Sequence, residues 1–199
     1  MRKWMFGALA LCGIWYFWPG KQPVKNAGRP VQTLVAFGDS LTAGYGAGGP
    51  QHAYPAQLAQ LSGKTVINLG KSGETAVQAL ARVRDVLDKQ PDMVLIEFGA
   101  NDHMQHLDFQ HTVSAVAQIT EAVQQAGAVA VLIDTAGPGM GAYTKAYKQL
   151  AREKHALFVP GIVRNIFYKK ALKSDLIHPN AAGYKIIAKD IYSVIKPYL

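Results

Sequence analysis

Short apolar segments alternate with segments of helical periodicity along most of this chain. Five segments have the length and the β-branched composition of buried strands: residues 32–37, 65–69, 93–98, 129–134 and 156–159. Four others have helical periodicity: residues 75–89, 109–126, 143–155 and 181–196. Strands interleaved with helices form a parallel sheet that helices cover on both faces. The pattern therefore predicts an α/β fold with a five-stranded parallel sheet.

Length and composition fit one such domain with a short appendage. The chain has 199 residues, of which 49% are hydrophobic and only 17% are charged, so a disordered, highly charged protein is excluded. Cys12 is the single cysteine. A disulfide-stapled scaffold and a zinc site built from cysteines are therefore excluded as well.

The net charge of +8 comes from two separate parts of the chain. Residues 1–30 contain five basic residues and no acidic one, and residues 31–142 contain five basic and ten acidic residues. Residues 143–199 contain eleven basic and three acidic residues. A nucleic-acid-binding domain gathers its basic residues on one folded surface, whereas here more than half of the excess precedes the domain. We therefore expect no nucleic-acid partner.

Residues 1–30 have the pattern of a signal or membrane-anchor segment with a linker, and residues 31–199 that of the catalytic domain. Two basic residues precede an uncharged run over residues 4–20, which would span roughly 25 Å as a helix, against about 30 Å for a hydrocarbon layer. The segment is a retained anchor, a cleaved signal, a lipidated terminus at Cys12 or an apolar terminus. We expect the domain to lie in the bacterial periplasm or at the outer face of the inner membrane, anchored or secreted, as a monomer.

The loops that leave the carboxyl ends of the predicted strands carry the candidate site, because ligands bind at that edge of a parallel sheet. Hydrolysis through a covalent intermediate needs a nucleophile, a base, a group that orients the base, and donors for an oxyanion. Ser40 directly follows the first strand and is the candidate nucleophile. Asp175 and His178 are three residues apart in the loop before the last helix, which suits an orienting carboxylate and its base.

Three backbone or side-chain donors are candidates for an oxyanion hole. The first is the backbone N–H of Ser40, near the positive end of a following helix. The second is the backbone N–H of Gly73, which no side chain shields, and the third is the side-chain amide of Asn101. Each motif alone also fits an ordinary turn or helix cap. Their joint order at the strand ends favours the catalytic interpretation.

Four segments together resemble the GDSL or SGNH hydrolases, and within them the bacterial acyl-CoA thioesterase/lysophospholipase/arylesterase type. They are residues 37–45 (FGDSLTAGY), 68–75 (NLGKSGET), 99–102 (GAND) and 175–180 (DLIHPN). The resemblance places the nucleophile on Ser40, the remaining oxyanion donors on Gly73 and Asn101, and the orienting acid and base on Asp175 and His178. It implies a flavodoxin-like three-layer α/β/α sandwich and no cofactor or metal.

The resemblance also implies an acyl ester or thioester substrate, either a small molecule or a lipid. We expect Asp39, Tyr54, His103 and Ile177 to contact it. Asp39, His103 and Ile177 lie within or beside the matching motifs, and Tyr54 lies where the resemblance places a loop that sets acyl-chain preference. The N-terminal segment is expected to hold the enzyme at a membrane surface. Two alternatives remain open: an O-acetylesterase that acts on cell-envelope carbohydrate, and a non-catalytic envelope-binding module on the same fold.

Overall fold

The computed structural model of the protein describes residues 23–135 and 137–199. The apolar run over residues 4–20, including Cys12, lies outside them, so the signal or anchor remains a prediction. No helix in the two described stretches is long and apolar enough to cross a membrane.

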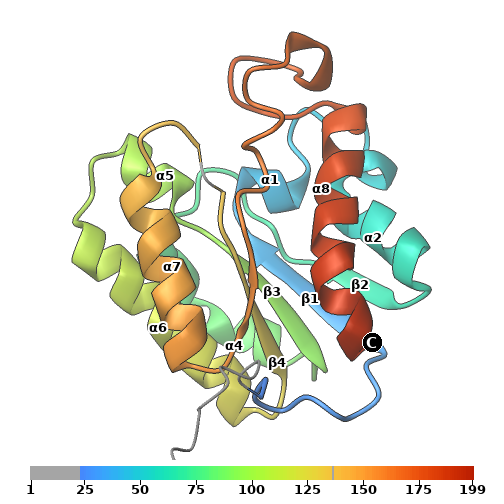
Figure 1. Ribbon diagram of the computed structural model, residues 1–199, viewed down its shortest axis with the longest axis vertical. Coiled ribbons are helices and arrows are strands. Elements are labelled where there is room, and N and C mark those ends of the chain that lie inside the picture. Colours follow the sequence, from blue (N-terminus) through green and yellow to red (C-terminus); the bar gives the residue numbers. More distant parts are fainter. Residues whose placement is uncertain (1–22, 136) are drawn as a thin grey trace, which may run out of the picture.

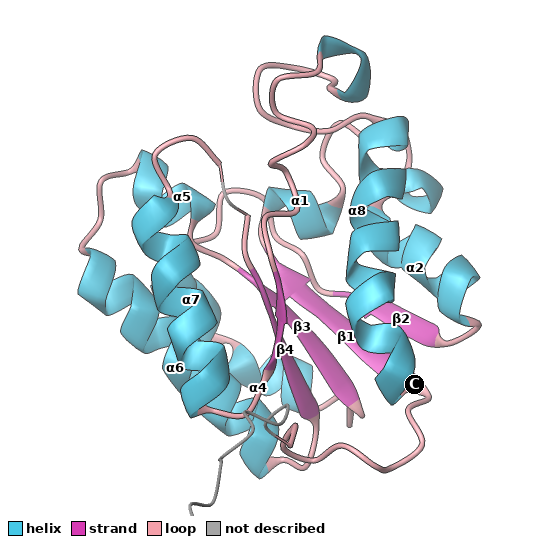
Figure 2. Ribbon diagram, viewed as in Figure 1, coloured by secondary structure: helices cyan, strands magenta, loops and turns pink. Residues whose placement is uncertain are grey.

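Five parallel strands form a single sheet in the order β2-β1-β3-β4-β5 (Figure 2). The strands are β1 (Thr33–Gly38), β2 (Thr65–Asn68), β3 (Met93–Glu97), β4 (Val129–Ile133) and β5 (Leu157–Val159). This is the order of the flavodoxin-like fold, in which chain direction across the sheet reverses between β1 and β3. The predicted five-stranded parallel sheet and its flavodoxin-like form are confirmed.

Helices cover both faces of the sheet (Figure 1). They are α1 (Ser40–Ala43), α2 (Tyr54–Ser62), α3 (Ala76–Ala81), α4 (Val83–Leu87), α5 (Ala100–Met104), α6 (Phe109–Gln125), α7 (Gly141–Glu153) and α8 (Ala181–Ile195), with 3-10 turns η1 (Pro50–His52), η2 (Lys170–Leu172) and η3 (Lys196–Tyr198). Helices α2 and α8 lie on one face, and α3, α6 and α7 lie on the other. The three-layer α/β/α sandwich is therefore confirmed.

The central strands supply apolar side chains to both layers. In β1, Leu34 and Ala36 pack toward α2 and α8, whereas Val35 and Phe37 pack toward α3 and α6. All four side chains are fully buried. Successive strand residues point to opposite faces, so a strand buried on both sides must be apolar throughout, and this is the pattern that made the strands visible in the sequence.

Two helical details differ from the sequence prediction. The single helix expected over residues 75–89 is divided into α3 and α4 at Arg82. The Arg82 guanidinium lies 4.5 Å from the ring centre of Phe37, forms an ion pair with Glu74 and donates to the Leu69 carbonyl, so tertiary contacts fix the break. Helix α2 was not predicted, although its first turn carries a proline at a position that favours helix starts.

Candidate active site

The turn between β1 and α1 presents Ser40 at the carboxyl edge of the sheet. Asp39 caps α1, because its side chain accepts a hydrogen bond of 2.9 Å from the backbone N–H of Leu41. A Cβ atom on Gly38 would lie 2.1 Å from Thr42 Oγ1 and 2.7 Å from the Glu97 carbonyl, so only glycine fits there. The close approach of these backbones fixes the place of Ser40 relative to β3.

Ser40, His178 and Asp175 form one line of side-chain hydrogen bonds. His178 Nε2 lies 3.1 Å from Ser40 Oγ, and His178 Nδ1 lies 2.8 Å from Asp175 Oδ2. The other carboxylate oxygen, Asp175 Oδ1, accepts from the backbone N–H groups of Ile177 and His178 at 2.8 and 2.7 Å. These distances are the hydrogen-bond distances that a base needs to take a hydroxyl proton while a carboxylate orients it.

Hydrogen bonds within its own loop stabilise the ionised form of Asp175. Partial burial acts to raise the pKa of Asp175, but the backbone N–H groups of His178 and Ile177 and the His178 ring outweigh it and lower the pKa to about 2. The ring of Tyr45 covers the imidazole, with 4.5 Å between the ring centres. His178 is therefore oriented from two sides, and the carboxylate beside it is charged at any pH near neutrality.

The three predicted oxyanion donors differ in their surroundings. Asn101 lines the same cavity as Ser40, but Nδ2 of its amide already donates to Asp39 Oδ2 and to the Glu74 carbonyl, both at 3.0 Å. Gly73 has a φ of 79°, which favours glycine, and it lines a neighbouring hollow with Lys71 and Arg82 and not the cavity around Ser40. The structure thus brings Ser40 and Asn101 together and leaves Gly73 on the adjoining loop.

A buried pair of acidic residues lies beneath the nucleophile turn. Glu97 Oε2 accepts from Thr42 Oγ1 at 3.1 Å, Glu97 Oε1 accepts from Thr135 Oγ1 at 3.0 Å, and Glu97 is completely buried. Burial raises the pKa of Asp39 to about 6. Burial, followed by the charge of Asp39, raises the pKa of Glu97 well above its ordinary value. Neighbouring carboxyl groups that are shielded from water resist carrying two negative charges, so they favour sharing one proton.

Glu97 was not identified from the sequence. It was visible as the one charged residue inside an otherwise apolar strand segment, residues 93–98. A charge at such a position requires buried partners. That signal could have placed Glu97 next to the turn that follows β1, since β1 and β3 are neighbours in the order of the sheet.

A largely apolar cavity of about 280 Å³ opens beside Ser40 and His178. We refer to it as the Ser40 cavity. Three of the four residues expected to contact substrate line it: Asp39, His103 and Ile177. Most of its other lining side chains are apolar: Leu41, Ala100, Met104, Pro138, Met140, Val163 and Phe167. Of these, Met104, Val163 and Phe167 were not identified from the sequence. The apolar side chains of the lining come from four separate segments of the chain, two of which are the helices α1 and α5, so no local sequence pattern connects them.

Tyr54 does not reach this cavity. Its side chain is fully buried beneath α1, where its hydroxyl lies 2.9 Å from Thr42 Oγ1. Burial raises the pKa of the Tyr54 phenol well above its ordinary value. We therefore correct the expectation that Tyr54 contacts substrate: helix α2 turns this side chain into the core.

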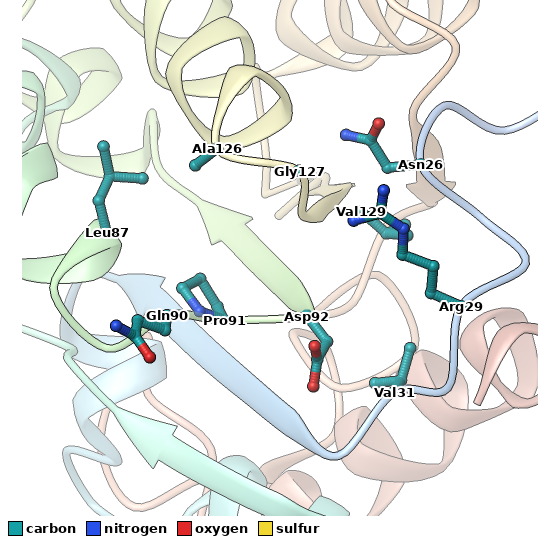
Figure 3. A pocket seen from close by; sticks show the side chains of 10 residues that line it. All are labelled: Asn26, Arg29, Val31, Leu87, Gln90, Pro91, Asp92, Ala126, Gly127 and Val129. Carbon is teal, nitrogen blue, oxygen red and sulfur yellow. The ribbon is translucent and has the colours of Figure 1, made fainter.

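A second hollow, of about 270 Å³, lies at the opposite edge of the sheet, where the strands begin (Figure 3). Two of its polar side chains, those of Asn26 and Asp92, form hydrogen bonds with backbone groups of neighbouring segments. Asn26 Nδ2 donates to the carbonyls of Gln124 and Ala128, and Asp92 accepts from the backbone N–H groups of residues 32 and 33. Part of the predicted linker, residues 23–30, is therefore attached to the domain on the side away from Ser40.

Comparison with known proteins identifies a family and several relatives that this chain resembles. The sequence profile of the GDSL-like Lipase/Acylhydrolase family matches residues 36–186. The thioesterase 1/protease 1/lysophospholipase L1 of Escherichia coli K12 is 32% identical over 175 residues, which cover 83% of this chain and 84% of the relative. An acetylxylan esterase of Geobacillus stearothermophilus is 27% identical over 199 residues, covering 79% of this chain and 91% of the relative.

Solved structures agree with these sequence matches. The crystal structure of TesA superposes with a TM-score of 0.78 at 25% sequence identity, and the match covers 84% of this chain and all of that one. The match with the family profile begins within β1 and ends within α8, so it includes both the loop of Ser40 and the loop of His178.

Proposed function

Because this chain belongs to the GDSL-like lipase/acylhydrolase family, it is an ester-cleaving hydrolase, and we propose that it works through a covalent acyl-enzyme on Ser40. One observation carries the proposal. The side chains of Asp175, His178 and Ser40 are joined by hydrogen bonds of 2.8 and 3.1 Å, and the serine hydroxyl borders an apolar cavity. The geometry supplies a nucleophile, a base and an orienting carboxylate at one place.

In the proposed reaction, His178 Nε2 takes the proton of Ser40 Oγ while the oxygen attacks the acyl carbonyl carbon. The tetrahedral intermediate then breaks its bond to the leaving alcohol or thiol, which receives the same proton from His178. In the second half, His178 takes a proton from water as the water oxygen attacks the acyl carbon. The bond to Ser40 breaks, the proton returns to Ser40 Oγ, and the carboxylic acid leaves. The charged Asp175 stabilises the imidazolium formed in each half.

We assign stabilisation of the oxyanion to the Ser40 N–H, the Asn101 amide and the Gly73 N–H. Both Asn101 contacts of 3.0 Å, to Asp39 Oδ2 and to the Glu74 carbonyl, fix the plane of its amide group. The oxyanion therefore shares one of these N–H groups with its present acceptor. Within the described residues, the Gly73 N–H makes no hydrogen bond, so it is free to turn toward an oxyanion.

Substitution of the triad tests this mechanism. Ser40→Ala and His178→Ala should each lower kcat/KM for p-nitrophenyl butyrate by at least 10³-fold, the scale at which loss of a triad member acts in serine hydrolases. Ser114→Ala, an exposed serine on α6, is the matched control and should leave kcat/KM unchanged. Full activity of the Ser40→Ala protein would refute the assignment.

We propose acyl chains longer than acetyl as the substrate class. The Ser40 cavity is lined mainly by apolar side chains and has about 280 Å³, near the lower end of the roughly 300–1,000 Å³ typical of ligand cavities. A short or medium acyl chain gains burial there, at about 0.8 kcal/mol per methylene group. In a series of p-nitrophenyl esters, kcat/KM should rise from acetate to butyrate and hexanoate. A steep fall beyond acetate would contradict the proposal.

An O-acetylesterase that acts on carbohydrate is the second candidate, because one relative is named an acetylxylan esterase. Release of acetate from acetylated xylan, compared with release of fatty acid from a lysophospholipid at equal enzyme concentration, distinguishes the two. The apolar lining of the Ser40 cavity supports the acyl-ester activity over the carbohydrate activity. Faster acetate release from the glycan would reverse that preference.

We also propose that the enzyme acts outside the cytoplasm, held at the inner membrane by its N-terminal segment. Two basic residues before an uncharged run over residues 4–20 support this placement. Alkaline phosphatase fused after residue 30 should be active in the bacterial periplasm. An inactive fusion with normal expression would contradict it.

A further inference from the structure

A projecting segment beside the Ser40 cavity combines exposed apolar side chains with unpaired cations. We call residues 164–179 the finger. It lies between β5 and α8 and extends beyond the carboxyl edge of the sheet, at the top of Figure 1. Its base is tied by a bridge between Lys173 and Pro179 and by a 2.9 Å bond from the Ser174 N–H to the His178 carbonyl. The finger therefore carries the catalytic loop at its base.

Exposed large apolar side chains gather beside the Ser40 cavity and on the finger. Of the eight that the described residues expose, five lie around this mouth or on the finger: Tyr45, Met104, Tyr168, Leu176 and Ile177. We call these five the apolar rim. Tyr168 is 83% exposed and Leu176 is 85% exposed, values that burial in a domain core normally prevents. Exposed apolar groups concentrated at a cavity mouth mark a surface that binds a partner.

Contacts connect four of the five rim residues with the Ser40 cavity. Met104 and Ile177 both line the Ser40 cavity, and Tyr45 packs on the His178 ring. On the finger, Tyr168 packs against Phe167, which also lines the cavity, with 5.4 Å between the ring centres. The rim is therefore continuous with the apolar wall of the cavity.

The finger is also strongly basic. It carries Arg164, Lys169, Lys170 and Lys173, whereas its single acidic residue, Asp175, is engaged with His178. Lys173 Nζ donates to the Leu176 carbonyl and lies 4.9 Å from the ring centre of Phe167. No ion pair within the described residues holds the other three cations.

We propose that the apolar rim and the finger cations dock the enzyme on an anionic lipid surface, so that an acyl chain passes from the lipid layer into the Ser40 cavity. This inference rests on the proposed function, because it supplies the route by which a lipid ester reaches Ser40. Lysine side chains next to anionic headgroups, and tyrosine rings at the headgroup level, are the combination that interfacial binding uses. A protein partner seated on the rim would instead cover the mouth of the cavity.

The test compares full-length variants on two presentations of an ester. The vesicles contain a fluorogenic long-chain ester in phosphatidylglycerol or in phosphatidylcholine, and p-nitrophenyl butyrate is the water-soluble substrate. The variants are Lys169→Ala/Lys170→Ala and Tyr168→Ser. The matched controls are Lys145→Ala/Lys148→Ala on the exposed face of α7 and Val77→Ser on α3. Every variant keeps the N-terminal segment, so its contribution to membrane binding cancels.

The double lysine variant should raise the apparent KM, expressed as phosphatidylglycerol vesicle concentration, by at least tenfold, because each lysine near an anionic surface contributes about fivefold to binding. The effect should shrink on phosphatidylcholine and at high salt. Tyr168→Ser should raise KM on both vesicles. Activity on p-nitrophenyl butyrate should stay within twofold of the parent for all variants.

Equal changes in the finger variants and in their controls would overturn the proposal, as would equal loss on the soluble and the vesicle substrate. Sedimentation with the same vesicles, measured for the Ser40→Ala protein with and without the finger substitutions, separates the docking proposal from the catalytic one. If Ser40→Ala keeps its esterase activity while the double lysine change weakens sedimentation, the catalytic assignment fails and the docking surface stands. If sedimentation is unaffected by the finger variants, the docking surface fails whatever the nucleophile.

Discussion

Asp175→Asn should abolish most of the activity while it leaves the fold intact. In the present structure Asp175 Oδ1 accepts two backbone N–H groups, from Ile177 and His178, and Oδ2 faces His178 Nδ1 at 2.8 Å. An asparagine has one oxygen, and the two backbone donors will hold it at the Oδ1 position. Its NH₂ group must then face Nδ1. Because two donors cannot face each other, the imidazole proton moves from Nδ1 to Nε2.

This change of tautomer removes the proton acceptor of Ser40. With a proton on Nε2, His178 can no longer accept the proton of Ser40 Oγ across their 3.1 Å contact. Loss of the correct tautomer costs serine hydrolases about 10³- to 10⁴-fold in kcat, or about 4–5.5 kcal/mol at 1.36 kcal/mol per tenfold. The assay is kcat/KM for p-nitrophenyl butyrate, with the melting temperature of each protein as a check on folding.

Asp88→Asn is the matched control for this change. Asp88 is also exposed, directly follows α4 and pairs with Arg84 at 2.8 Å, away from the Ser40 cavity. It should change neither kcat/KM nor, by more than about 0.5 kcal/mol, the free energy of unfolding. If the Asp175→Asn protein kept more than a tenth of the parent kcat/KM, the tautomer argument would be refuted.

Three further changes test the structure around the nucleophile turn. Gly70→Ala would place a Cβ atom 2.1 Å from the Ala43 backbone nitrogen. It should lower the free energy of unfolding by about 3 kcal/mol and also lower kcat/KM. Gly141→Ala is the control and should be tolerated, because a Cβ atom there meets open space. Tyr54→Phe should lower stability by about 1 kcal/mol, measured by urea unfolding, and leave KM unchanged. Because burial raises the pKa of Asp39 to about 6, the folded state holds that proton more tightly, so the contribution of Asp39 to stability is lost as pH rises from about 4 through 6. The loss over this range should be smaller in Asp39→Asn, where only Glu97 of the pair still titrates.

The strands were predictable because burial on both faces demands uninterrupted apolar segments, as in residues 93–98. Their flavodoxin-like arrangement was expected only from the family resemblance. The break of the helix at Arg82 was not predictable from the sequence, because contacts of the Arg82 side chain cause it. One partner, Phe37, is distant in sequence, and the other, Glu74, lies before the helix begins. Helix α2 escaped notice because its apolar face is short, and its stability comes from packing against α8. Local periodicity cannot report such tertiary contacts.

The same distinction holds for the candidate site. Ser40, Asp175 and His178 were identified because their chemistry can be inferred from sequence alone, together with their places after the first strand and before the last helix. The direction in which a side chain points cannot be inferred in that way. Tyr54 lies close to the nucleophile in sequence, but as the first residue of α2 it points into the core. The cavity lining, including Phe167, comes together only when the finger folds over the sheet edge.

Covalent labelling tests the central claim most directly. The full-length protein is treated with a fluorophosphonate, which reacts with an activated serine hydroxyl, and the adduct is located by mass spectrometry of the digested protein. We predict one adduct, on Ser40, which is lost in Ser40→Ala and strongly slowed in His178→Ala. Labelling at another residue, or undiminished labelling of the Ser40→Ala protein, would contradict the account.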